Sequence, residues 1–138
     1  DMIYPKGRPF TCLVYTNISE IPHLTDLISA LPKVQFKIAS RQHVTDKLAQ
    51  LITYPNVTVY SAIAGLNGLD LELLRTSDLL LDNPGRKVVE ILDAFRFENK
   101  PILGFEDLKS TKHNQQTYSR DRWKEMAETI RQMRKKSL

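Results

Sequence analysis

The stretch "DLLLDNPGRKVVEILDAF" at residues 78–95 decides the fold, because a short apolar run passes directly into a helical pattern. The leucines within 78–82 are typical of a buried strand. Asn83-Pro84-Gly85 ends that strand with three turn-forming residues, and apolar side chains then recur at helical spacing from residue 88. In many α/β proteins a charged group of the ligand lies at such a strand-to-helix turn.

The same alternation of apolar run and helical pattern continues on both sides of this stretch. Strands that alternate with helices form a parallel sheet covered on both faces, and its ligands bind at the carboxyl ends of the strands. The sequence therefore predicts an α/β fold with a doubly wound, five-stranded parallel sheet. We expect its strands at residues 10–16, 34–40, 57–61, 78–82 and 101–105.

The length of 138 residues suits one domain, so we expect residues 1–138 to form a single unit. The stretch "EDLKSTKHNQQTY" at 106–118 is polar and has no clear periodicity, which predicts a loop.

The sequence starts at Asp1 and stops soon after a basic helical pattern. From these ends we expect the chain to be a piece of a longer protein.

A terminal basic amphipathic helix is predicted at 119–136, with Ser119 at its start. This segment carries the chain's whole net charge of +4, because 120–136 hold seven Lys or Arg against three acids. Trp123, Ala127, Ile130 and Met133 form a narrow apolar stripe on it. Such a stripe favours packing against the chain's own sheet over docking to a partner. Aromatic residues do not interleave with the basic ones, so we expect a solvated face and no nucleic-acid partner.

The sequence gives no sign of a membrane or of an oxidising compartment. Its longest apolar runs fall far short of the ~20 residues that span a bilayer, and no secretory signal pattern is present. The single cysteine, Cys12, lies in the first predicted strand and cannot form an internal disulfide. We interpret it as a buried apolar residue. These features favour a cytoplasmic protein without a membrane span.

Several common types of site are missing from the sequence. The turn Thr16-Asn17-Ile18-Ser19 after the first predicted strand lacks the glycines of a dinucleotide site, and no P-loop occurs. The three histidines are scattered, which argues against a zinc site. A Gly-x-Ser-x-Gly elbow is absent as well. We therefore expect no metal ion and no resident cofactor.

The second half of the chain resembles a known family. The stretches "YPNVTVYSAIAGLNGLDLELLRTSDLLLD" and "KVVEILDAFRFENKPILGFED" are similar to the C-terminal half of two-domain (GT-B) retaining glycosyltransferases. The best matches are Thr76-Ser77-Asp78-Leu79 and Asn99-Lys100-Pro101-Ile102, and the resemblance is good from about residue 50 to 110. It implies a Rossmann-like domain on the side of the cleft that holds the nucleotide-sugar donor.

The resemblance also implies two carboxylates, seven residues apart, around the turn after the fourth strand. Alignment on Lys100 and Pro101 places Asp93 near the second position, with Glu90 as its rival. The first position falls on Gly85 or its neighbours, none of which is acidic. The carboxylate pair is therefore degraded, and we have no confident catalytic residue.

Family members hold the donor diphosphate with an Arg and a Lys after the first strand, and the matching turn here has neither. Without such cations a leaving diphosphate is poorly stabilised. Arg41, Arg86 or Lys87 could replace them, the last two at a helix N-terminus that favours anions. If a UDP-sugar binds, we expect its site at Asn17, Ser40, Arg41, Ala62, Ile63, Asn83, Gly85, Arg86, Lys87 and Glu90.

One subgroup of the family departs from the pattern in the same way. In bacterial accessory secretion systems, the enzyme that adds N-acetylglucosamine to Ser/Thr-rich adhesins has two similar subunits. One is catalytic, and the other lacks the carboxylate pair, binds the acceptor polypeptide and stabilises its partner. This chain resembles the C-terminal half of the second subunit, which implies the catalytic subunit and the acceptor polypeptide as partners.

Two alternatives stay open at this point. One is an active donor-binding domain of a retaining glycosyltransferase, and the other is a free-standing flavodoxin-like binding module. Whether the chain is the accessory subunit or an active donor-binding domain, we do not expect the isolated domain to catalyse sugar transfer, because the acceptor half of the cleft is not in the sequence.

Overall fold

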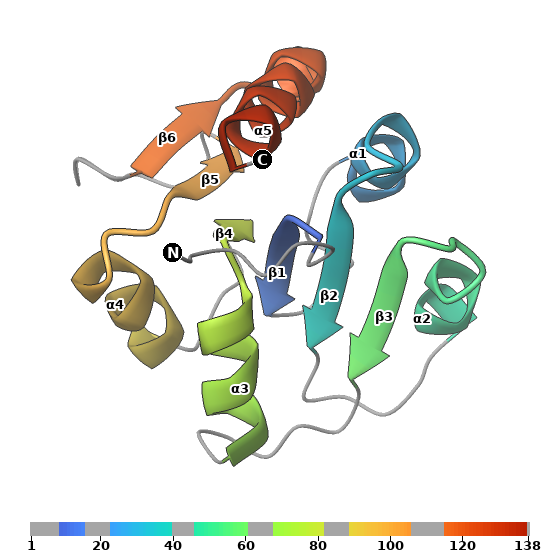
Figure 1. Cartoon of the computed structure of the whole chain (residues 1–138). Helices are drawn as coiled ribbons and strands as arrows, with labels where there is room; N and C mark the ends of the chain where they lie inside the picture. The colour runs from blue at the N-terminus through green and yellow to red at the C-terminus, as the bar shows by residue number, and fades with distance from the viewer. Residues whose placement is uncertain are drawn as a thin grey trace.

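The computed structural model describes residues 9–15, 23–39, 46–60, 68–81, 89–105 and 115–137. Helices and strands alternate along these residues (Figure 1). In chain order they are β1 (Thr11–Tyr15), α1 (Leu24–Ala30), β2 (Gln35–Ala39), α2 (Asp46–Leu51), β3 (Val57–Tyr60), α3 (Gly68–Thr76), β4 (Leu79–Leu81), α4 (Val89–Phe97), β5 (Ile102–Phe105), β6 (Gln115–Tyr118), the 3₁₀ turn η2 (Arg120–Arg122) and α5 (Trp123–Ser137).

The strands of the described residues form one parallel sheet in the order β3-β2-β1-β4-β5-β6. β1 lies at its centre, with Cys12 opposite Phe36 of β2 on one side and opposite Leu79 of β4 on the other. This is the Rossmann order, so the predicted doubly wound α/β fold is confirmed. A flavodoxin-like sheet would place β1 beside β3. The observed order rules that alternative out as a fold.

The sheet has one strand more than the predicted five. β6 lies within the stretch that we expected to be a loop and pairs with β5, with Phe105 opposite Tyr118. Gln116 and Thr117 are exposed, since β6 is the edge strand. An edge strand buries few side chains and therefore lacks the apolar alternation by which strands are found in a sequence.

Alternate residues of each central strand point to opposite faces of the sheet, and a core lies on each face. Cys12 and Val14 belong to the larger core, whereas Leu13 belongs to the smaller one. Side chains of α1, α2 and α5 cover the larger core, and those of α3 and α4 cover the smaller one. α5 thus returns across the sheet and contacts α1 (Figure 1). Two covered faces are what the continuous apolar strands predicted.

Cys12 is fully buried at the centre of the larger core, as we expected. Burial raises the pKa of its thiol far above the ordinary value, and a backbone hydrogen bond with Leu81 offsets this only in part. The thiolate is the reactive form of cysteine. Cys12 therefore acts as an apolar core residue and not as a nucleophile.

The apolar stripe of α5 faces the chain's own sheet, which confirms the interpretation that we favoured. Ala127 and Ile130 are buried, as is Met126, and Trp123 and Met133 pack against them. The α-helix begins at Trp123 rather than at Ser119, because the turn η2 comes first. No helix of the described segments is both long and apolar enough to cross a membrane.

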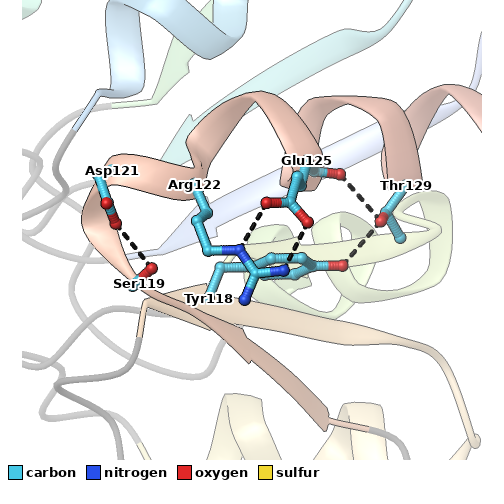
Figure 2. A network of polar contacts seen from close by, with 6 residues as sticks. All are labelled: Tyr118, Ser119, Asp121, Arg122, Glu125 and Thr129. Atoms are coloured by element: carbon cyan, nitrogen blue, oxygen red, sulfur yellow. Dashed lines mark hydrogen bonds and ion pairs between the residues drawn. The ribbon is translucent and has the colours of Figure 1, made fainter.

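Polar contacts fix the junction between β6 and α5 (Figure 2). The Tyr118 hydroxyl lies 2.7 Å from Oγ1 of Thr129. Arg122 donates two hydrogen bonds to Glu125, one of them 2.6 Å long. These bonds lower the pKa of the Glu125 carboxyl below its usual range. Ser119 donates to Asp121 at 2.8 Å and does not cap the helix with its side chain.

Candidate functional site

The candidate site is the carboxyl edge of the sheet, next to β1 and β4. β1 leads to β2 on one side, and β4 leads to β5 on the other, so the direction of winding reverses between them. Ligands of open parallel sheets bind outside the carboxyl ends at such a switch point. Tyr15, Ala39 and Tyr60, the last residues of β1, β2 and β3, lie level with one another. The carboxyl ends of these three strands therefore share one edge of the sheet.

The structure describes the strand ends but not the segments in which the predicted ligand-binding residues lie. Those residues follow β1, β2, β3 and β4 in the sequence, where a switch-point site would require them. They lie outside the described residues, and their roles stay predictions. They are Asn17, Ser40, Arg41, Ala62, Ile63, Asn83, Gly85, Arg86 and Lys87.

The two carboxylate candidates both belong to α4. Glu90 lies in its first turn, and its side chain is outside the described part. The Asp93 side chain is 65% exposed, and its Oδ1 lies 3.6 Å from a terminal nitrogen of Arg96. A single exposed carboxylate paired along its own helix is typical of a helix surface. Among the described residues, no three His, Cys, Asp or Glu side chains gather closely enough to hold a metal ion.

An aromatic cluster that the sequence did not predict lies at the same edge. The ring of His23 stacks on Trp123 at 5.6 Å between centroids and lies 6.5 Å from Phe105. His23 Nδ1 is 2.9 Å from a carboxylate oxygen of Asp26. The cluster joins the start of α1, the end of β5 and the start of α5, and the first two of these lie next to segments that the structure does not describe. His23 and Trp123 are partly exposed at that edge, and Phe105 is buried beneath them.

His23 also has an unusual backbone conformation, with φ 58° and ψ 25°. A non-glycine residue in the left-handed region costs free energy and persists only where its surroundings hold it. The stacking on Trp123 and the contact with Asp26 are such restraints. The sequence offered no signal for this cluster, because the stacked partners are far apart in the chain.

The residues that carry the family resemblance lie at the opposite, amino edge and have structural contacts. The Asp78 carboxylate accepts a hydrogen bond of 2.8 Å from the backbone N–H of Thr11, at the start of β1. Lys100 Nζ donates to the carbonyl of Leu74 at 2.8 Å, near the end of α3. Asp78 and Lys100 each connect neighbouring elements. The sequence motifs that contain them therefore indicate the fold rather than a ligand-binding site.

The chain is similar to a known protein family and to proteins that are named for glycosyl transfer. The family model described as the GftB/GlyA-F C-terminal domain matches residues 12–138. Glycosyltransferase GlyA of Streptococcus pneumoniae serotype 4 is 46% identical over 134 residues, which are 96% of this chain and 19% of GlyA. The N-acetylglucosaminyltransferase stabilizing protein GtfB of Streptococcus gordonii is 32% identical over 102 residues, 73% of this chain and 22% of GtfB.

Two crystal structures have the same architecture. Apo glycosyltransferase GlyE of Streptococcus pneumoniae TIGR4 matches with a TM-score of 0.75 and 27% identity, over 94% of this chain and 35% of that one. The GtfA/B complex bound to UDP and GlcNAc matches with a TM-score of 0.73 and 25% identity, over 94% of this chain and 29% of that one. The chain therefore spans about a third of these structures and about a fifth of the curated relatives.

Proposed function

This chain belongs to the GftB/GlyA-F C-terminal domain family, and from that premise we propose that it is the non-catalytic domain of a protein-glycosylation enzyme. In this proposal the domain binds the acceptor polypeptide, a Ser/Thr-rich adhesin, and stabilises the catalytic part. The catalytic part is a separate glycosyltransferase subunit or another region of the same polypeptide.

The observation that carries the proposal is that the same kind of domain occurs in proteins whose names give them different roles. GlyA is named a glycosyltransferase, whereas GtfB is named a stabilizing protein. A domain common to both has a role that both need, and binding or stabilisation meets that condition better than catalysis does. Asp93 supports the same choice, because its carboxylate is exposed and paired along its own helix, whereas a catalytic carboxylate normally lies in a cleft beside the other reacting groups.

A second candidate is a donor-binding domain that takes part in catalysis. The observation in its favour is the Rossmann strand order, which brings the segments after β1 and β4 to one switch point. The similar GtfA/B complex was crystallised with UDP and GlcNAc. In this alternative the cations Arg41, Arg86 and Lys87 would hold a diphosphate at the carboxyl edge.

Acceptor binding is the first property to test. We expect an unglycosylated Ser/Thr-rich polypeptide to bind the chain and to shift a contiguous set of amide resonances in a titration followed by NMR. A matched polypeptide with alanine at every Ser and Thr is the control and should bind at least about tenfold more weakly, since it lacks the hydroxyls that a specific site would bond. Equal binding of both polypeptides, or of neither, would contradict the acceptor role.

A further inference from the structure

A groove of about 280 Å³ lies at the amino edge of the sheet, between the end of α1 and the last turns of α5. Its floor is apolar and comes from Ala30, at the end of α1, and from Leu31, Pro32 and Val34 in the turn that follows. Its rim carries the four cations Lys33, Arg131, Arg134 and Lys135. We call this feature the basic groove. It is far from the carboxyl edge, because both helices run antiparallel to the strands.

One rim cation is held in place by the protein itself. Arg131 donates to the backbone carbonyl of Ala30 at 3.0 Å and also contacts Glu128 at 2.9 Å. A hydrogen bond from Gln132 and the contact with Arg131 lower the pKa of Glu128. Arg131 thus joins α5 to the end of α1. The wall of the groove is fixed before any ligand arrives.

The other three rim cations are not in salt-bridge contact with any described carboxylate, although the charge of Lys135 helps to lower the pKa of Glu128. Within the described residues, no carboxylate forms an ion pair with Lys33, Arg134 or Lys135. Cations in the last turn of a helix are common, since they offset the helix dipole. Lys33 comes from a different element, the turn after α1, and faces the same groove. Two elements distant in the sequence therefore place four cations around one apolar floor, and Glu128, which pairs with Arg131, offsets only part of their charge.

The chemistry of the groove selects one class of ligand. A single-stranded nucleic acid is normally held by aromatic side chains that stack on its bases, and none lines the groove. A duplex binds through its phosphates alone, which would leave the apolar floor unused. A helix that binds a bilayer inserts its apolar face, but the apolar face of α5 is buried against the sheet. A polypeptide that carries both carboxylates and aliphatic side chains fits the rim and the floor together. We propose that the basic groove binds an acidic segment with interspersed aliphatic residues on a partner protein.

The test uses a fluorescein-labelled short peptide in which glutamates alternate with leucines, followed by fluorescence anisotropy. We expect it to bind the chain, and we expect the double variant Lys33→Glu/Lys135→Glu to bind it at least about tenfold more weakly. Lys124→Glu/Lys136→Glu is the matched control. It changes the net charge equally on exposed positions that do not line the groove, and should cost less than about threefold.

Three further results would overturn the proposal. Equal losses in the two double variants would mean that only the overall charge attracts the peptide. Undiminished binding of a peptide with glutamine in place of glutamate would remove the role of charge. Tighter binding of duplex DNA or of anionic phosphatidylglycerol vesicles, lost in the same groove variant, would assign the groove to a different partner. Equal thermal unfolding midpoints for all variants exclude misfolding as the cause.

Discussion

Asn56→Leu is expected to lower the free energy of unfolding by about 3 kcal/mol, because one buried amide satisfies several backbone carbonyls. The Asn56 Nδ2 group donates to the carbonyl of Ile28 at 3.2 Å, of Leu31 at 3.0 Å and of Val34 at 3.1 Å. These carbonyls belong to the end of α1 and to the turn that leads into β2. Leucine removes the donor and leaves buried acceptors without it, which costs about 1–3 kcal/mol for such a group.

Urea unfolding of the chain measures this effect. Asn56→Asp is the more specific variant, since it keeps the shape of the side chain but replaces the donor with an acceptor. We expect it to destabilise the fold at neutral pH at least as much as leucine does. Gln116→Glu makes the same change of amide to carboxylate at an exposed position of the edge strand β6 and should stay within about 0.5 kcal/mol of the parent chain. Equal effects at both positions would show that the three carbonyl contacts contribute little.

The second large effect concerns the residue at the centre of the family signature. Asp78→Ala is expected to cost about 2 kcal/mol of stability, because the buried carboxylate accepts a charge-assisted hydrogen bond from the Thr11 N–H. The backbone N–H of Asp78 donates in turn to the Thr11 carbonyl at 2.8 Å. Together these contacts fix the start of β1 beside β4, the pair of strands that forms the switch point.

Asp78→Asn is the matched control, since its amide oxygen can still accept the Thr11 bond, and we expect a smaller loss. Urea unfolding gives the stability of each variant. Because Asp78 lies away from the carboxyl edge and does not line the basic groove, binding of the acceptor polypeptide and of the acidic peptide by the folded variants should be unchanged. A variant of normal stability with altered ligand binding would instead place Asp78 in the functional site.

The fold could be predicted from the sequence because its signals are local. The strand, turn and helix of residues 78–95 each have a characteristic apolar pattern, and repetition of that unit implies a parallel sheet. The packing of α5 followed equally from its narrow stripe of Trp123, Ala127, Ile130 and Met133. β6 was missed because an edge strand is polar.

The polar contacts and the binding surfaces were harder to predict, because they depend on tertiary contacts. Nothing in the sequence indicates that the Asn56 amide reaches three carbonyls of another segment. The stacking of His23 on Trp123 likewise joins residues with no shared pattern. The positive charge of α5 is evident in the sequence, but the position of Lys33 beside that helix depends on the fold. Sequence patterns report burial well, but not which distant polar groups meet.

Donor binding is the property that separates a non-catalytic domain from a catalytic one most directly. We would titrate the chain with UDP, UDP-glucose and UDP-N-acetylglucosamine and follow every backbone amide by NMR. The non-catalytic function predicts no specific shifts up to millimolar nucleotide. Shifts clustered at Asn17, Ser40, Arg41, Ala62, Ile63 and the segment 83–90, with sub-millimolar affinity, would contradict it and would assign the carboxyl edge to the sugar donor.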